Sequence, residues 1–232
     1  MEHDQYRDQD HIKSYVTRAS RMSPSQRRAY DEYRETFCVP FCPGKQELGA
    51  LFPDSTRPLI LEIGFGMGDA TAELAAAMPA TNFLGVEVHK PGVGKLLGMI
   101  SERGLTNIRI INHDAMEVLE QMIPSGSLDG IHLFFPDPWQ KARHHKRRFV
   151  RPGITRILAD RLRIDGYFYM VTDWGEYAVS ALETLSQTPG LTNSHEAFAS
   201  PQPWRPTTAF ERKGMAAERP IREILFRRGV VT

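Results

Sequence analysis

Short apolar runs alternate with longer amphipathic segments from Pro58 onward. Runs of this length predict buried strands, and the amphipathic segments between them predict helices. The predicted strands lie at residues 59–63, 83–88, 108–111, 128–135 and 167–172. The predicted helices lie at residues 69–78, 92–103, 115–122, 152–163 and 176–187. Alternating strands and helices predict βαβ units, and hence an α/β fold whose mostly parallel sheet is covered by helices on both faces.

The two ends of the chain show different patterns. Residues 1–22 lack apolar periodicity, and we expect them to form a mobile, mildly basic arm. Ser23, Pro24 and Gln26 form a capping signature, so a helix is expected from there to about Thr36. Residues 37–57 are rich in proline and glycine and predict a loop, whereas residues 221–226 alternate as an antiparallel strand would. We divide this single-domain chain into an arm with its first helix, residues 1–36, and an α/β domain, residues 37–232.

Composition narrows the class of protein. The chain has 232 residues, 41% of them hydrophobic and 25% charged, which suits one globular domain. The apolar runs are too short to span a membrane and the first residues do not form a signal peptide, so we expect a soluble, cytoplasmic protein. Cys38 and Cys42 are too few for a disulfide framework or a zinc site, so we expect free thiols and no metal.

Basic charge is clustered although the net charge is only +1. Residues 141–151 contain six basic side chains and no acid: Lys141, Arg143, Lys146, Arg147, Arg148 and Arg151. Residues 205–228 hold seven basic residues against three acids. Clustering of this kind favours contact with a polyanion such as a nucleic acid, to which the arginines Arg18, Arg21, Arg27 and Arg28 could add. For any single basic residue, a solvated surface position remains the alternative.

A glycine loop follows the first predicted strand. The sequence L-E-I-G-F-G-M-G places glycines at 64, 66 and 68, and the third comes one residue too early for a dinucleotide-binding loop. Glu87 ends the next strand, where it could accept from ribose hydroxyls. Gly64, Gly66 and Gly68 together with Glu87 therefore predict a site for a nucleoside without a pyrophosphate, namely S-adenosylmethionine. A purely structural tight turn is the alternative.

Other acids follow or interrupt the predicted strands. Glu62 lies within an otherwise apolar strand, so we expect it to face the cofactor, with a satisfied core carboxylate as the alternative. Asp114 follows the third strand and could receive an adenine amino group. Asp137 lies between Pro136 and Pro138, which end the fourth strand and fix the direction of the acid. Trp139 beside it could pack beneath this loop or stack on a base.

Taken together, these segments resemble the bacterial tRNA (guanine-N7-)-methyltransferases over roughly residues 11–228. The matching segments are S-Y-V-T-R-A-S-R-M-S-P-S-Q (14–26), L-E-I-G-F-G-M-G (61–68), G-V-E-V-H (85–89), F-F-P-D-P-W-Q-K-A-R-H-H-K-R-R (134–148), V-T-D-W (171–174) and T-A-F-E-R-K-G (208–214). The resemblance implies a class I, Rossmann-like fold with a seven-stranded sheet whose last strand is antiparallel. It also implies methyl transfer from S-adenosyl-L-methionine to N7 of a guanine in the tRNA variable loop, leaving S-adenosyl-L-homocysteine.

The resemblance also implies roles for individual residues. Contact with the cofactor is implied for Glu62, Glu87, Asp114 and Asp137, and contact with the substrate for Lys141, Arg143, Asp173, Thr208, Phe210 and Glu211. Asp173 and Glu211 could instead be partners of nearby arginines. Gln140 and Ala209 depart from the family pattern, and Ala209 could weaken one phosphate contact.

The expected chemistry centres on Asp137. Guanine N7 carries a lone pair and no proton, so the reaction needs no general base. We therefore expect Asp137 to orient the base and offset its developing positive charge. The alternatives are methylation of another RNA or of a small molecule, a non-catalytic RNA-binding protein, and a nicotinamide-dependent oxidoreductase, which the glycine spacing disfavours. The expected partner is tRNA, with no membrane, and the protein as monomer or homodimer.

Overall fold

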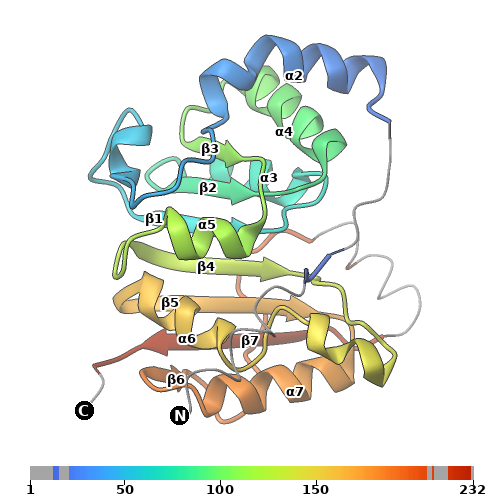
Figure 1. Cartoon of the computed structure of the whole chain (residues 1–232), viewed down its shortest axis with the longest axis vertical. Helices are drawn as coiled ribbons and strands as arrows, with labels where there is room; N and C mark the ends of the chain where they lie inside the picture. The colour runs from blue at the N-terminus through green and yellow to red at the C-terminus, as the bar shows by residue number, and fades with distance from the viewer. Residues whose placement is uncertain (1–12, 16–20, 208–210, 212–218, 231–232) are drawn as a thin grey trace.

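The computed structural model describes residues 13–15, 21–207, 211 and 219–230. A seven-stranded sheet with the order β3-β2-β1-β4-β5-β7-β6 forms its centre (Figure 1). The strands are β1 (Leu59–Ile63), β2 (Asn82–Val86), β3 (Ile108–Ile111), β4 (Leu128–Phe134), β5 (Leu162–Thr172), β6 (Leu191–Asn193) and β7 (Arg222–Arg228). The first five strands are parallel, and β7 is antiparallel to both β5 and β6. The predicted fold class is confirmed.

Helices cover both faces of the sheet, as expected where parallel strands are joined by crossovers. The α-helices are α2 (Pro24–Phe37), α3 (Asp69–Ala77), α4 (Lys90–Arg103), α5 (Ala115–Gln121), α6 (Ile154–Arg161) and α7 (Gly175–Ser186). Two short 3₁₀ helices, η1 (Leu48–Leu51) and η2 (Ala142–Arg147), lie in the connections. No helix within the described part of the chain is long and apolar enough to cross a membrane.

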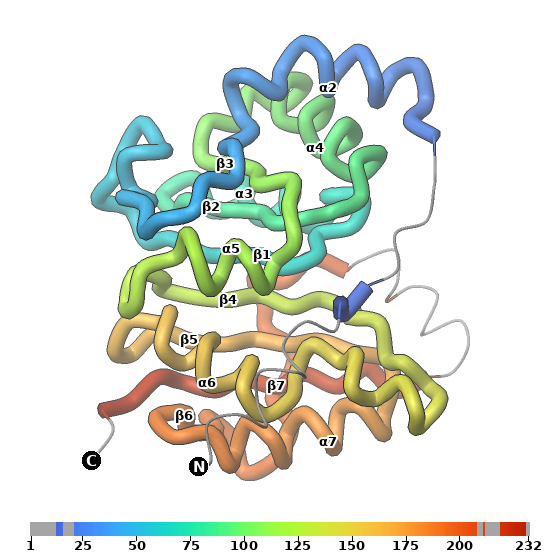
Figure 2. The backbone as a smooth tube through the Cα atoms, viewed as in Figure 1, coloured from blue at the N-terminus to red at the C-terminus, as the bar shows by residue number. Residues whose placement is uncertain are grey.

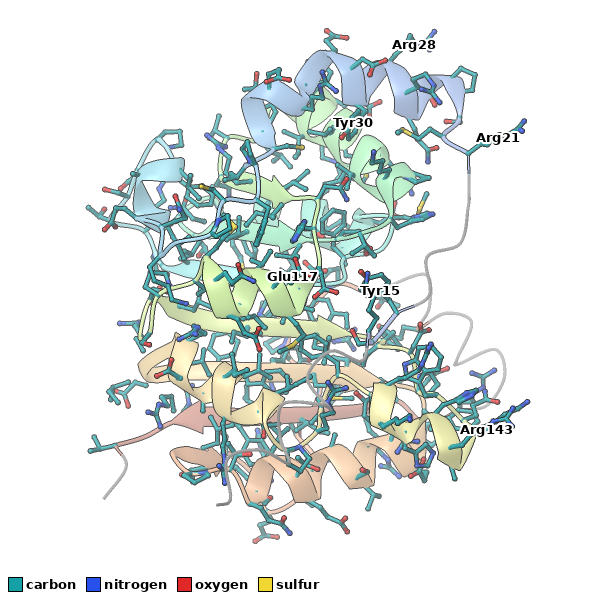
Figure 3. All side chains as sticks on the ribbon, viewed as in Figure 1. Tyr15, Arg21, Arg28, Tyr30, Glu117 and Arg143 are labelled. Carbon is teal, nitrogen blue, oxygen red and sulfur yellow. The ribbon has the colours of Figure 1, made fainter. Side chains whose placement is uncertain are left out.

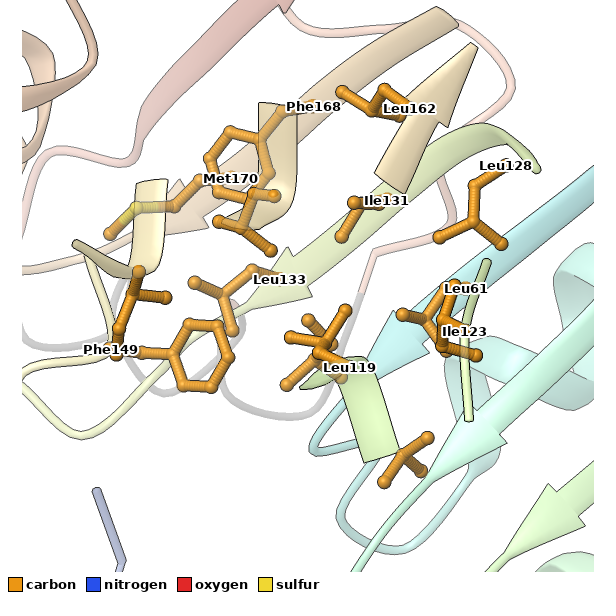
Figure 4. Close-up of a cluster of buried hydrophobic side chains, with 14 of the residues drawn as sticks. Leu61, Leu119, Ile123, Leu128, Ile131, Leu133, Phe149, Leu162, Phe168 and Met170 are labelled. Atoms are coloured by element: carbon orange, nitrogen blue, oxygen red, sulfur yellow. The ribbon is translucent and has the colours of Figure 1, made fainter. Parts of the chain in front are cut away.

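Two hydrophobic cores form because successive residues of each strand point to opposite faces. Leu61 of β1 packs with Ile131, Leu133 and Phe168 and with Leu119 of α5 on one face (Figure 4). On the other face, Ile60, Phe83 and Tyr169 pack with α3 and α4, with the side chains of α2 outside them. Both faces of the sheet are therefore covered by hydrophobic packing. A ligand can reach the sheet at the edge formed by the carboxyl ends of the strands.

Helix α2 belongs to the body of the domain. Its capping signature forms as predicted, because the Ser23 hydroxyl accepts from the Gln26 backbone N–H at 3.2 Å and the Gln26 side chain accepts from the Ser23 backbone N–H at 2.7 Å. It runs along α4 (Figure 2), where a Cβ at Gly94 would approach the Gln26 carbonyl oxygen to 2.5 Å. The missing side chain at Gly94 therefore allows the two helices to approach closely.

Two features of the strands differ from what the sequence predicts. Strand β5 begins at Leu162, within the predicted helix 152–163, because Leu162 pairs with Leu128 before an irregularity that separates it from the pair Tyr167–Gly130. Asp165 has a positive φ of 66°, so Asp165 and Gly166 interrupt the regular strand pattern. Strand β6 has three residues, which is too short for a periodicity to be visible in sequence.

Candidate active site

A pocket of about 520 Å³ opens at the carboxyl ends of β1, β2 and β4. It lies where the strand order reverses between β1 and β4, the usual ligand position in open α/β sheets. The lining comes from six separate parts of the chain: Ser14 and Tyr15, residues 62–70, residues 86–89, His113 with Ala115, residues 133–137, and Phe149. The glycine loop, Glu62, Glu87 and Asp137, which the sequence predicts as site residues, therefore meet in one cavity.

The glycine loop adopts a conformation that side chains would strain. Gly64, Gly66 and Gly68 have positive φ values of 69°, 60° and 77°. Such values cost little for glycine and are rarely adopted by other residues. The Gly66 carbonyl oxygen also lies against α4, where a Cβ at Gly92 would come within 1.8 Å of it. The close spacing of the three glycines thus turns the chain from β1 into α3 and leaves its backbone exposed to the pocket.

Glu87 holds this loop against the end of β2. Its Oε2 accepts from the Gly66 backbone N–H at 2.8 Å, and its Oε1 accepts from Val88 at 2.7 Å and His89 at 2.9 Å. The side chain lines the pocket although the residue is only 9% exposed. Glu87 therefore has a structural task that the sequence does not reveal, alongside the predicted contact with a ribose.

Glu62 is a buried acid that faces the pocket. It is 2% exposed, and its Oε2 has no hydrogen-bond partner among the described residues. Burial raises its pKa to about 7, with the Thr71 hydroxyl acting to lower the pKa and the nearby Glu87 carboxylate acting to raise it. A buried polar atom without a partner is costly, so this arrangement is suited to a ligand that brings a hydrogen-bond donor or a positive charge.

Asp114 caps α5 at one corner of the pocket but is not itself among the lining residues. Its Oδ1 accepts from the backbone N–H groups of Met116 at 2.8 Å and Glu117 at 3.3 Å, and its neighbours His113 and Ala115 line the cavity. Tyr15 lies over this corner beside the carboxyl end of β4 (Figure 3), and burial together with Asp114 raises the pKa of Tyr15. Ser14 and Tyr15 were not predicted as site residues, although they belong to the matching segment S-Y-V-T-R.

The loop that carries Asp137 is bounded by two strained residues. Phe135 and Trp139 have positive φ values of 48° and 47°, which are uncommon for bulky side chains and are often found at functional sites. Asp137 lies between them, exposed at the rim of the pocket. Phe135 donates its backbone N–H to the Val171 carbonyl oxygen at 2.8 Å, which fixes the start of the loop to β5. Pro136 and Pro138, together with the positive φ values of Phe135 and Trp139, restrict the backbone around Asp137 and fix its position.

The basic run after this loop divides into buried and exposed residues. Arg148 is 3% exposed, donates from Nη1 and Nη2 to the two carboxylate oxygens of Glu176, and donates from Nε to the Pro138 carbonyl oxygen at 2.9 Å. Arg151 is also buried and donates to the Lys146 carbonyl oxygen at 2.6 Å. The expectation that all of residues 141–151 contact phosphates is therefore narrowed. Lys141, Arg143 and Lys146 form the exposed basic face, with Arg143 on the same edge as Tyr15 (Figure 3).

The predicted substrate contacts at Asp173 and Glu211 are both paired with arginines. Asp173 accepts from Arg219 at 2.7 Å, and Glu211 receives two bonds from Arg205, at 2.5 and 2.8 Å. This is the arrangement that the sequence left open as the alternative for both acids. Thr208, Ala209 and Phe210 lie outside the described residues. Cys38 is half-buried and Cys42 exposed, both as free thiols, and burial raises the pKa of Cys38 to about 11.

Solved structures with this fold are RNA and antibiotic-resistance methyltransferases. The 16S rRNA methyltransferase KamB matches with a TM-score of 0.54 at 12% identity, over 92% of this chain and 97% of that one. The antibiotic-resistance methyltransferase Kmr matches with a TM-score of 0.52 at 14% identity, over 75% and 88% of the two chains. These matches show that the chain has the class I methyltransferase fold, with its pocket at the point where the strand order reverses. Enzymes of this class take their methyl group from S-adenosylmethionine.

Sequence relatives narrow this class to one family. A family described as "Putative methyltransferase" matches residues 56–224. Proteins named tRNA (guanine-N(7)-)-methyltransferase are 52% identical in Burkholderia cenocepacia and 53% in Burkholderia vietnamiensis, each over 94% of this chain and 85% of the relative. That of Paracidovorax citrulli is 51% identical over 94% and 87%. The chain belongs to the tRNA (guanine-N7-)-methyltransferase family.

Proposed function

We propose that this protein transfers the methyl group of S-adenosyl-L-methionine to N7 of a guanine in the tRNA variable loop. The observation that carries the proposal is the position of Asp137, at the rim of a nucleoside-sized pocket and directly before an exposed basic face. The pocket accommodates a methyl donor, and the basic face is suited to the phosphates of a large RNA. The names of the family relatives agree with this substrate.

The pocket residues fit S-adenosylmethionine. The orphaned Oε2 of Glu62 is suited to the cationic amino group of the cofactor's methionine part. The glycine loop at Gly64, Gly66 and Gly68 would lie against the cofactor, with Glu87 toward the ribose and Asp114 toward the adenine. When bound, the cofactor supplies a methyl group on a positively charged sulfur, and S-adenosyl-L-homocysteine remains after transfer. The proposal requires no metal.

Asp137 would act on the guanine rather than on a proton. Neutral guanosine presents a lone pair at N7, so the nucleophile exists without deprotonation. Methylation leaves a positive charge on the ring, which a fixed carboxylate can offset, and orientation of the reactants can supply several kcal/mol of rate enhancement. Because the flanking residues Phe135 and Trp139 already hold the loop in place, little rearrangement of Asp137 is needed on binding. Asp173 and Glu211, each held in place by its arginine, would contact the guanine edge when the substrate is bound, together with Thr208 and Phe210.

Exposed basic residues flank the pocket on the same edge of the molecule. Arg143 lies on one side of the pocket residue Tyr15, and Arg21 and Arg28 lie on its other side, toward the end of the sheet that carries α2 (Figure 3). Such a distribution would let a folded tRNA bind through its backbone while one exposed guanine enters the pocket. Gln140 lies directly before this basic face and is exposed.

The test uses tritiated methyl groups and tRNA that lacks N7-methylguanine. After incubation with S-[methyl-³H]adenosylmethionine, borohydride and aniline cleave the tRNA where N7-methylguanine has formed. We expect cleavage at the variable loop with the unaltered protein and its loss with Asp137→Ala. Asp160→Ala is the matched control, because Asp160 is an exposed acid that pairs with Arg161 at the opposite edge of the sheet.

Each unexpected result contradicts a different part of the proposal. Labelled tRNA that resists aniline would place the methyl group on another atom. A protein that binds S-adenosylmethionine but labels no tRNA would point to a different substrate. Equal cleavage by Asp137→Ala and Asp160→Ala would remove Asp137 from the reaction.

A further inference from the structure

A buried ionic cluster lies at β7 and is not part of the pocket lining. The Arg205 guanidinium bridges two carboxylates, with its Nη1 and Nη2 on Glu211 at 2.5 and 2.8 Å and its Nη2 on Glu223 at 2.7 Å. The side chains are 5%, 10% and 2% exposed, respectively. One guanidinium thus binds two carboxylates, and Glu211 is the more exposed of the two. Such an arrangement is costly to bury and contributes orientation more readily than stability.

The segment that carries Arg205 is fastened to the sheet. Trp204 stacks on His132 of β4, with ring centroids 5.1 Å apart and an angle of 14° between the planes. The backbone N–H of Gln202 donates to Glu223 Oε2 at 3.2 Å, and the Tyr169 hydroxyl donates to the same oxygen. The Ala199 backbone N–H donates to the Glu223 carbonyl oxygen at 2.7 Å. Contacts with β4, β5 and β7 therefore fix the segment that carries Arg205, which also binds Glu211.

This cluster lies at the level of the Asp137 loop. Glu223 on β7 is the cross-strand partner of Val171 on β5. The Val171 carbonyl oxygen in turn accepts from Phe135, two residues before Asp137. Glu223, which holds Arg205, and Phe135, which begins the Asp137 loop, therefore both contact Val171 of β5. The relative position of Glu211 and Asp137 thus depends on the rigid strands β5 and β7.

We infer that Arg205 is a positioning residue for guanine recognition, fixing the Glu211 carboxylate through a two-pronged contact while Glu223 fixes Arg205. The inference rests on the proposed function, in which Glu211 accepts from the guanine edge. The planar guanidinium binds both oxygens of one carboxylate in a set orientation, which a lysine ammonium does not reproduce. Arg205 acts only through Glu211 and does not contact the substrate.

The test is a double-variant cycle on the full-length protein with Arg205→Lys, Glu211→Gln and both together. The kcat and the KM for tRNA are measured, and the Kd for S-adenosylmethionine is measured by calorimetry. We expect kcat to fall on the order of tenfold or more in each single variant, because misplacement of a positioning group acts on the reacting geometry. The double variant should be no slower than the slower single variant, since Arg205 works through Glu211. Cofactor affinity should stay within about twofold, because neither residue lines the pocket.

Two further variants separate positioning from loss of structure. Glu223→Gln retains the size of the side chain and weakens its hold on Arg205, so kcat should fall in the native background but not in the Glu211→Gln background. Arg57→Lys is the matched control, because Arg57 pairs with Asp54 at the start of β1, at the opposite edge of the sheet. It should leave kcat unchanged.

Three results would overturn the inference. The first is a normal kcat in Arg205→Lys while kcat is reduced in Glu211→Gln. The second is a double variant in which the two reductions of kcat multiply. The third is a normal kcat in Glu211→Gln. The unaltered protein is assayed first for N7-methylguanine. Failure of the proposed function would appear there as missing product, whereas failure of this inference would appear as a change in the pattern among active variants.

Discussion

The indole N–H of Trp139 donates to the carbonyl oxygen of Ser14 at 3.2 Å, joining the Asp137 loop to a segment 125 residues earlier in the chain. Because Ser14 and Tyr15 line the pocket, this bond connects the rim on which a base would rest with the wall around the cofactor. The Arg147 guanidinium lies over the ring of the same indole, 4.7 Å from its centroid. Trp139 therefore makes contacts within the protein, and the alternative that it stacks on a base stays a prediction.

Trp139→Phe should weaken cofactor binding without tRNA present. Phenylalanine retains an aromatic ring but cannot donate to Ser14, and a hydrogen bond of this kind is worth about 1 kcal/mol. We expect the Kd for S-adenosylmethionine to rise about fivefold by calorimetry. Trp174→Phe serves as the control, because Trp174 does not line the pocket. An unchanged Kd would show that Ser14 and Tyr15 do not contribute to binding.

Glu62 makes the stability of the ligand-free protein depend on pH. Its pKa rises from 4.5 to about 7 on folding, so the folded chain binds more protons than the unfolded chain between these values. Stability therefore falls as pH rises from 4.5 to about 7 and is constant above, with a total change of about 3 kcal/mol. Glu62→Gln should remove this slope and be the more stable protein at pH values above 7, as measured by urea unfolding. An identical slope in both proteins would contradict the assignment.

The same carboxyl group should make cofactor binding depend on pH in the opposite direction. The ionised form of Glu62 is the one suited to a cationic ligand, so binding releases a proton when Glu62 is protonated beforehand. We expect the affinity for S-adenosylmethionine to rise roughly tenfold as pH increases through the pKa of Glu62 and then to level off. Glu62→Gln should bind weakly, with no such rise. Calorimetry in buffers of different ionisation enthalpy would measure the proton release directly.

Arg148→Ala should destabilise the fold. It removes a buried guanidinium that pairs with Glu176 and holds the Pro138 carbonyl oxygen, which is expected to cost on the order of 3 kcal/mol. Chemical denaturation measures this loss, and Lys146→Ala, a change of an exposed neighbour, should leave the free energy of unfolding within about 0.5 kcal/mol. If the two variants were equally stable, the division of the basic run into buried and exposed residues would be wrong.

The exposed basic face should control the salt dependence of tRNA binding. Replacing Lys141, Arg143 and Lys146 together by alanine removes up to three phosphate contacts. The slope of log K against log salt concentration should become shallower by about 2 to 3, while cofactor affinity stays unchanged. Filter binding across a range of salt concentrations measures the slope. A parallel shift with the original slope would indicate that these residues do not contact phosphates.

The parts of the structure that follow from local pattern could be predicted from the sequence. The run L-E-I-G-F-G-M-G predicts a strand that ends in a glycine loop, and residues 69–78 predict the helix that follows, because each of these depends on neighbouring residues. The start of β5 could not be predicted, since Leu162 pairs with Leu128 only when the sheet is assembled. The burial of Arg148 was missed for a similar reason, because its partner Glu176 lies on a different helix.

In the site as well, local sequence predicts which residues take part, whereas their contacts depend on the assembled fold. The sequence predicts the acids Glu62, Glu87 and Asp137, which meet in the pocket, but it does not predict what each contacts. The role of Glu87 in holding Gly66 and the role of Arg205 in holding Glu211 depend on backbone positions that no motif contains. Ser14 reaches the pocket from a segment that sequence periodicity identifies only as an arm.

The contact between Gly92 and the Gly66 carbonyl oxygen has a consequence for mutational tolerance. Any side chain at position 92 would collide with the loop backbone, since even a Cβ would lie 1.8 Å from that oxygen. The collision would shift Gly66 and thereby the carboxylate of Glu87 that accepts from it. A survey of substitutions scored by activity would thus rank Gly92 among the pocket residues, although Gly92 does not line the cavity. The thickness of the helical layer and the shape of the ligand cavity cannot evolve independently in this protein.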